Sequence, residues 1–180
     1  MPTIALVNNK GGVGKSTTAV HFSRWLEKRR KQVMLVDADA HESSSRWLDN
    51  RKSNIEYLAF TDPNRILDSI PKLAEKTDFM VVDAPAGMTE TTRAILLRAD
   101  LAVCPCQPTT LDTDSTEQNF ANHQAGPIFK RWQTVRSVSS KQGTEEYEGE
   151  KRCFALVQAK WLSLAYNLYP STTIFNGFVR

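Results

Sequence analysis

The chain has 180 residues, 41% of them hydrophobic and 24% charged, which is the size and composition of one ordinary globular domain and excludes a wholly disordered chain. No apolar run approaches the roughly 18 residues of a membrane span, and the N-terminus lacks the pattern of a secretory signal. The three cysteines cannot all pair with one another, and with no export signal we expect reduced thiols and a cytoplasmic location. The segment 163–170 has little basic amphipathic character, so we expect no membrane partner. The net charge of +3 permits an anionic partner without requiring one.

Short apolar runs alternate with helical patterns through about residue 103. The runs predict strands at 3–7, 33–36, 55–60, 79–82 and 101–103, and the helices between them are expected at about 15–30, from 63 onward and at 91–98. This alternation predicts an α/β fold, with a doubly wound and mostly parallel sheet that carries helices on both faces. Such sheets bind ligands at the carboxyl ends of their strands.

Two of the expected helices carry further local signals. The first has one apolar face, made by Ala19, Phe22 and Leu26. The second begins with Asp62 as N-cap and Pro63 as first helical residue, and Pro71 is expected to break or kink it. Its buried stripe consists of Ile66, Ile70 and Leu73.

The alternation weakens beyond about residue 124, although residues 1–180 are expected to form one domain. The stretch 131–152 is polar, and we expect a long surface loop or local disorder there. The remaining expectations are a strand at 154–157, a short helix at 162–168 and a β-prone segment at 172–175.

The strongest motif is a glycine-rich loop between the first expected strand and helix. Its glycines let backbone N–H groups turn inward as an anion nest, and the helix that follows adds its positive end. Lys15 can reach the β- and γ-phosphates of a nucleotide, and the Ser16 hydroxyl can ligate Mg²⁺. The pattern G-x-x-x-x-G-K-[ST] is matched except at its first position, which is Asn9. The phosphate-binding residues expected from this motif are Lys10, Gly11, Gly12, Val13, Gly14, Lys15, Ser16 and Thr17.

Three carboxylates stand at the ends of two other expected strands. Asp37 and Asp39 follow one strand, and Asp83 follows another, where it suits a Walker B role in the Mg²⁺ shell. A single aspartate at a strand end is more often a helix cap, but three in this order favour a nucleotide site. We therefore expect a nucleotide and Mg²⁺ at this site, with Ser16 and Asp83 around the metal. Gly87 is expected to be a hinge that senses the γ-phosphate.

Four segments together resemble the ParA/MinD family of deviant Walker ATPases, over about residues 2–120. They are 10–17, 36–39, 82–87 and 99–105. The resemblance implies a P-loop NTPase fold and a homodimer that encloses two ATP molecules, with Lys10 of each subunit reaching the phosphates bound by its partner. It implies that Asp39 positions the attacking water, beside Asp37 as metal-shell or orienting neighbour. It also places Pro105 and Pro108 in a loop near the nucleotide.

The resemblance further implies the catalytic residues Lys10, Lys15 and Asp39 and a Mg²⁺-dependent ATPase. The ATP dimer would bind DNA non-specifically at the nucleoid, and a partner protein would stimulate hydrolysis. The expected task is segregation or positioning of a plasmid, chromosome or other cargo. Two alternatives stay open: a nucleotide-binding protein with little hydrolysis, because residues 125–180 diverge from the family, and a metabolic P-loop ligase of similar fold. Lys10 argues against the ligase.

Two weaker signals have simpler explanations. Cys104 and Cys106 lack the spacing and the number of ligands of a metal site, so buried packing is the favoured interpretation. The basic run 28–31 at a helix end is better explained by the helix dipole and by solvation than by DNA binding. A phosphate-backbone surface in and just before the polar stretch stays an open alternative. Its basic residues are Lys130, Arg131, Arg136, Lys141, Lys151 and Arg152.

Overall fold

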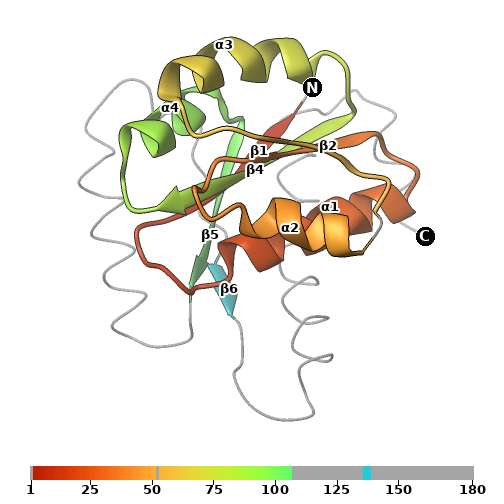
Figure 1. Cartoon of the computed structure of the whole chain (residues 1–180), viewed down its shortest axis with the longest axis horizontal. Helices are drawn as coiled ribbons and strands as arrows, with labels where there is room; N and C mark the ends of the chain where they lie inside the picture. Colours follow the sequence, from red (N-terminus) through yellow and green to blue (C-terminus); the bar gives the residue numbers. More distant parts are fainter. Residues whose placement is uncertain (1, 52, 107–135, 139–180) are drawn as a thin grey trace.

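The computed structural model describes residues 2–51, 53–106 and 136–138, which form a parallel sheet with helices on both faces (Figure 1). The elements in chain order are β1 (Thr3–Asn8), α1 (Lys15–Lys28), β2 (Val33–Asp37), α2 (Ser43–Asn50), β3 (Glu56–Ala59), α3 (Pro63–Ala74), β4 (Phe79–Ala86), α4 (Glu90–Arg98), β5 (Leu101–Cys106) and β6 (Arg136–Val138). The strand order is β3-β2-β4-β1-β5-β6, and every neighbouring pair is parallel. The predicted fold class is therefore confirmed.

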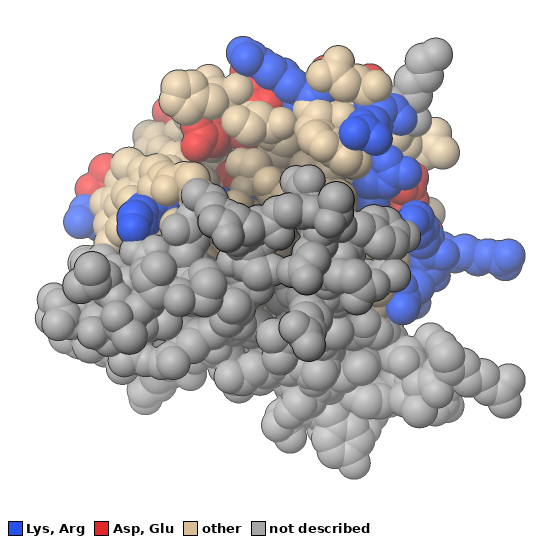
Figure 2. Space-filling view, turned by 90° about the horizontal axis from the view of Figure 1, so that it is seen from below, with Lys and Arg blue, Asp and Glu red and all other residues tan. Residues whose placement is uncertain are grey.

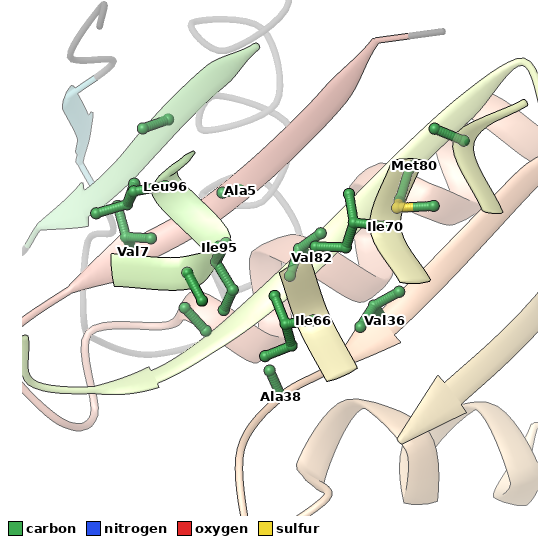
Figure 3. Packing of buried hydrophobic residues seen from close by; sticks show 14 of the residues in the cluster. Ala5, Val7, Val36, Ala38, Ile66, Ile70, Met80, Val82, Ile95 and Leu96 are labelled. Carbon is green, nitrogen blue, oxygen red and sulfur yellow. The ribbon is translucent and has the colours of Figure 1, made fainter. Parts of the chain in front are cut away.

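Strands β1 and β2 and most of β4 are buried on both faces, because α1 and α2 cover one side of the sheet and α3 and α4 the other. Ile4 and Leu6 of β1 pack on the side of α1 and α2. Ala5 and Val7 point the other way, toward α3 and α4, where Ile66, Ile70, Ile95 and Leu96 complete the core (Figure 3). The predicted apolar face of α1 is confirmed, since Ala19, Phe22 and Leu26 are all buried.

Helix α3 begins as predicted but does not stop at its internal proline. The Asp62 side chain accepts a hydrogen bond from the Arg65 backbone N–H at 2.6 Å, which caps the helix. Pro71 has no N–H to donate to the carbonyl of Leu67, four residues earlier. Arg98 of α4 donates its Nε to that carbonyl at 3.0 Å, and α3 continues to Ala74. The predicted break was wrong, since Arg98 of a neighbouring helix supplies a donor to the carbonyl that Pro71 cannot reach. A kink at Pro71, the other expected outcome, stays a prediction.

Several elements differ from the sequence expectations. Strand β4 continues past Asp83 to Ala86, and α2 was not predicted at all. The stretch 131–152, predicted to be a loop or disordered, contains β6, which pairs with β5 through Cys104 and Arg136. A strand of three residues is too short to show an alternating pattern, so only its pairing identifies it. The expected elements at 154–157, 162–168 and 172–175 lie outside the described residues. Among the helices of the described part, none combines the length and apolar character that crossing a membrane requires.

Candidate nucleotide site at the carboxyl ends of the strands

The glycine-rich loop connects β1 to α1, as predicted. Gly12 and Gly14 have φ of 72° and 91°, a left-handed conformation that residues with a side chain rarely adopt. Gly14 is the N-cap of α1, and its carbonyl accepts the Thr18 N–H at 2.9 Å. The first N–H groups of α1 have no partner within the helix, so this end of the helix favours an anion.

The two lysines of the loop lie in different environments. Lys15 is buried, and its Nζ donates to the Lys10 carbonyl at 3.1 Å. Burial lowers the pKa of Lys15, while the carboxylates of Asp83 and Asp39 oppose this shift. Lys10, in contrast, has an exposed side chain. The Lys15 ammonium is therefore held inside the loop, whereas the Lys10 side chain is accessible from outside the loop.

The loop is attached to the sheet by Asn8, a residue to which sequence reasoning gave no separate role. Its Oδ1 accepts the Lys10 backbone N–H at 2.9 Å, and its Nδ2 donates to the Pro105 carbonyl of β5 at 2.7 Å. These two bonds set the position of Lys10 relative to β5. An asparagine at a strand end gives no sequence signal for this function, because the partner carbonyl lies 97 residues further along the chain.

The two aspartates predicted to surround a metal are paired in register across β2 and β4. Asp37 lies opposite Asp83, and both residues are fully buried. The Asp37 carboxylate is satisfied by the protein: Oδ2 accepts the Ser45 N–H and hydroxyl, both at 2.9 Å, and Oδ1 accepts the Asp39 N–H at 3.2 Å. Asp37 therefore holds the start of α2 in this conformation.

Asp83 is in the opposite situation, because neither of its buried carboxylate oxygens has a hydrogen-bond partner. Burial raises the pKa of Asp83 to about 6, and the negative charge of Asp37 adds to the rise. The hydroxyls of Ser16 and Ser44 and the charge of Lys15 are close enough to oppose it, although neither hydroxyl has hydrogen-bond geometry. Mg²⁺ binds oxygen ligands and is usually held by only one or two protein carboxylates. An unpartnered carboxylate beside the Ser16 hydroxyl is therefore a suitable set of ligands for it. The residues present thus fit the expected metal.

Asp39 lies at the edge of this cluster, on the segment between β2 and α2. Its Oδ1 accepts the His41 N–H at 2.9 Å, and its side chain is half-buried. Glu42, just before α2, has φ of 50°, a left-handed conformation that is unfavourable for a residue other than glycine. Beside Asp39 lies an open cleft of about 330 Å³. The residues that line it are Asp39, Glu42, Ala59, Phe60, Thr61, Asp62 and Arg65.

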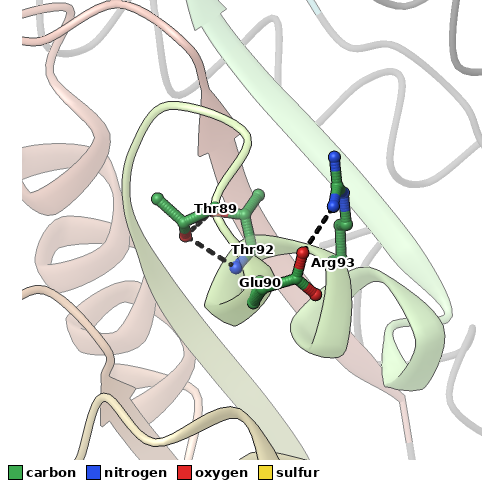
Figure 4. A network of polar contacts seen from close by, with 4 residues as sticks. All are labelled: Thr89, Glu90, Thr92 and Arg93. Carbon is green, nitrogen blue, oxygen red and sulfur yellow. Dashed lines mark hydrogen bonds and ion pairs between the residues drawn. The ribbon is translucent and has the colours of Figure 1, made fainter.

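The segment after β4 is held to the start of α4. Gly87 has φ of 90°, and its carbonyl accepts the Thr92 hydroxyl at 2.9 Å. The Thr89 side chain caps α4 by accepting the Thr92 N–H, and Glu90 pairs with Arg93 one turn on (Figure 4). The hinge expected at Gly87 stays a prediction.

The remaining predicted site residues lie either at the start of α1 or in and after β5. Gly11, Val13, Ser16 and Thr17 lie in the loop or the first turn of α1, together with the residues above. Pro108 lies outside the described residues, whereas Cys104 and Pro105 are buried in β5. Within the described ranges there is no group of three or more His, Cys, Asp and Glu side chains that could hold a metal on their own.

Comparison with known proteins places this site in context. The chain is 34% identical over 111 residues to maintenance of carboxysome distribution protein A from Gloeobacter kilaueensis, covering 61% of this chain and 50% of that protein. It is 28% identical over 134 residues to chromosome-partitioning ATPase Soj from Thermus thermophilus, covering 58% of this chain and 54% of that protein. The chain thus spans about half the length of these curated relatives.

A solved structure shares the fold and carries a nucleotide. Cobyrinic acid a,c-diamide synthase from Mycobacterium smegmatis, with a bound ATP analog and magnesium, superposes with a TM-score of 0.67 at 18% identity, covering 84% of this chain and 78% of that one. The model of the CobQ/CobB/MinD/ParA nucleotide-binding domain matches residues 4–127, which confirms the resemblance seen in the motifs. The chain belongs to this family of P-loop nucleotide-binding domains.

Proposed function

We propose that this chain is a partition or positioning ATPase that works as an ATP-bound homodimer. The observation that carries the proposal is the second lysine of the phosphate loop. Lys15 is buried inside the loop, where one nucleotide would lie, while Lys10 is exposed on its outer side. An exposed loop lysine of this kind suits the phosphates of a nucleotide held by a second subunit. The names of the relatives, a carboxysome distribution protein and a chromosome-partitioning ATPase, support the same class of task.

The residues of the site divide the proposed reaction among them. The loop amides and Lys15 bind and orient the β- and γ-phosphates. Ser16 and Asp83 would hold Mg²⁺, which when bound neutralises charge on these phosphates. Asp39 would orient the attacking water, and Asp37 keeps the Asp39 segment and α2 in place through its bonds to the Asp39 and Ser45 N–H groups. In this assignment Asp37 acts as a neighbour of the metal shell rather than as a direct ligand.

We assign DNA binding and the response to a partner protein to the ATP-bound dimer. Dimerisation would double the basic surface of one subunit, so the ATP form would bind DNA non-specifically and associate with the nucleoid. A partner protein that carries or recognises the cargo would then stimulate hydrolysis and release the dimer from DNA. The cargo is a plasmid, a chromosome or another large assembly.

The decisive experiment is Lys10→Ala on an Asp39→Ala background, which prevents hydrolysis from removing the dimer. Loss of a desolvated contact between an ammonium and a facing triphosphate should cost about 2–5 kcal/mol of dimer stability. We expect the double variant to bind ATP and remain monomeric by light scattering after size exclusion with ATP and Mg²⁺. Lys72→Ala on the same background, an exposed lysine of α3, serves as control and should dimerise. If the Lys10 variant dimerises as well as its parent, Lys10 is an incidental loop lysine and the proposal fails.

Two other functions predict different results. A metabolic ligase is favoured by the shared fold of cobyrinic acid a,c-diamide synthase and by the cleft beside Asp39, which could admit a small substrate. Such an enzyme would keep its turnover in Lys10→Ala, since its reaction needs no partner subunit at that position. A nucleotide-binding protein with little hydrolysis would show no ATP turnover above background, with or without DNA. Turnover that rises on addition of DNA and depends on Lys10 separates the partition ATPase from both.

A further inference from the structure

A basic surface covers the outer side of α1 and α2, away from the nucleotide loop. We call it the α1–α2 basic surface, and its seven side chains are Arg24, Lys28, Arg29, Arg30, Lys31, Arg46 and Arg51. Figure 2 looks from below Figure 1 and shows Lys and Arg side chains gathered along the right edge of the described surface. The sequence analysis identified only the basic run 28–31. It did not predict α2, which contributes Arg46 and is followed by Arg51.

The positive charge of this surface is not balanced locally. Only Glu27 and Asp49 add negative charge on the two helices, and Asp49 already accepts the Tyr57 hydroxyl at 2.6 Å. Among the described residues, none of the seven cations forms an ion pair. The helix dipole explains cations in a last turn, such as Lys28, but not Arg24, which precedes the last turn of α1, or Arg46, which lies in the first turn of α2 at the positive end of that helix. Solvation and the dipole therefore do not account for the whole surface.

Three of the arginines are ordered by tryptophan rings rather than by carboxylates. The Arg29 guanidinium carbon lies 3.7 Å from the centroid of the Trp25 ring. Arg24 of α1 and Arg51 at the end of α2 lie 5.6 and 5.1 Å from the Trp47 ring. A guanidinium group that lies over an indole ring still has N–H groups available for phosphate oxygens, and of these three arginines only Arg29 has a further bond among the described residues, from its Nη1 to the Trp25 carbonyl at 3.5 Å. Ordering the side chain in advance also reduces the entropy lost on binding.

We propose that the α1–α2 basic surface binds the phosphate backbone of duplex DNA. Arginines that form no ion pair among the described residues, on a surface where cations outnumber carboxylates, complement DNA phosphates, which carry no base information. Single-stranded binding by base stacking is disfavoured, since guanidinium groups already lie over the tryptophan rings. A lipid surface is disfavoured because, among the described residues, the exposed large apolar side chain is Leu97, which belongs to α4 on the other face of the sheet.

This inference rests on the proposed function, which includes non-specific DNA binding, and it adds the surface responsible. The surface belongs to two helices that pack on one face of the sheet and lies outside the phosphate loop. Changes to it should therefore leave ATP binding and basal hydrolysis as they are. That separation allows the surface to be tested apart from the nucleotide site.

The test compares two double variants of the full chain that remove equal charge. Arg29→Gln/Arg51→Gln removes two cations of the surface, and Lys72→Gln/Lys76→Gln removes two exposed cations at α3 and just beyond its end. Binding to a labelled 30-base-pair duplex is followed by fluorescence anisotropy at 50, 100 and 200 mM salt, with a non-hydrolysable ATP analog and Mg²⁺. The surface variant should lose at least about tenfold in affinity at 100 mM salt. The slope of log K against log salt should become shallower by about 1.8, the value for two lost phosphate contacts.

The outcomes distinguish this inference from the proposed function. If the wild type binds duplex DNA and the surface variant binds equally well, only the surface assignment is overturned. If the two double variants lose affinity to the same extent, the loss reflects net charge and the assignment is again overturned. If the wild type does not bind duplex DNA even at 50 mM salt, the surface assignment and the DNA-binding part of the proposed function both fail. Loss of binding to phosphatidylserine vesicles without loss of DNA binding would assign the surface to lipid instead.

Discussion

Replacing Asp83 by asparagine should stabilise the nucleotide-free protein at neutral pH. The Asp83 carboxylate is buried without a hydrogen-bond partner, and its pKa is raised from 3.8 to about 6. Because the folded-state pKa is the higher one, the carboxylate destabilises the fold above pH 6, and this penalty disappears as pH falls to about 4. A rise of about 2 pKa units corresponds to about 3 kcal/mol, of which a buried, unpartnered amide would retain about 1–2 kcal/mol. We therefore expect Asp83→Asn to be more stable by about 1–2 kcal/mol at pH 7.5.

Urea unfolding monitored by tryptophan fluorescence at pH 7.5 and pH 4.5 measures this difference directly. The stabilisation should be largest at pH 7.5 and shrink strongly at pH 4.5, where the wild-type carboxyl is mostly protonated in the folded state. Asp78→Asn is the control, because that carboxylate accepts the Gln32 N–H at 2.9 Å, so its loss should not stabilise the protein. With Mg²⁺ and ATP the order should reverse, since only the wild type retains the ligand for the metal. A variant that is less stable than wild type at pH 7.5 without nucleotide would refute the reasoning, because it would mean that Lys15 fully compensates the charge.

Three further changes test other parts of the description. Lys15→Ala removes the buried ammonium of the loop and should weaken ATP binding at least about tenfold by calorimetry, and unchanged affinity would contradict the phosphate-loop assignment. Asp39→Ala should bind ATP within about twofold of wild type and lose turnover by about 100-fold or more; turnover that stays within about twofold would assign the water to another residue. Arg98→Ala leaves the Leu67 carbonyl without its donor and should lower the free energy of unfolding by about 1 kcal/mol or less, whereas Arg93→Ala, on the same helix, should have a smaller effect.

The phosphate loop and the sheet could be predicted because their signals are local. The loop requires glycines and lysines at fixed spacing, and buried parallel strands are continuous apolar runs, so short windows of sequence contain both. Pro71 shows the limit of this approach. Its effect on α3 depends on Arg98, which is 31 residues away from the carbonyl that it contacts. Residue propensity alone predicts that the helix breaks at Pro71. In the structure α3 continues past Pro71, and the hydrogen bond from Arg98 accompanies it.

Helix α2 escaped prediction because most of its buried residues are polar. Leu48 is its one fully buried apolar residue in the described structure, so it shows no apolar stripe of the kind that identified α1 and α3. Its other buried residues are Ser44 and Ser45, and Ser45 gives both its N–H and its hydroxyl to Asp37. Asp37 and Asp83 are adjacent only because β2 and β4 pair in register across about 45 residues of chain. A serine that binds one of these carboxylates therefore has no sequence signature, although it holds the start of α2 beside Asp37.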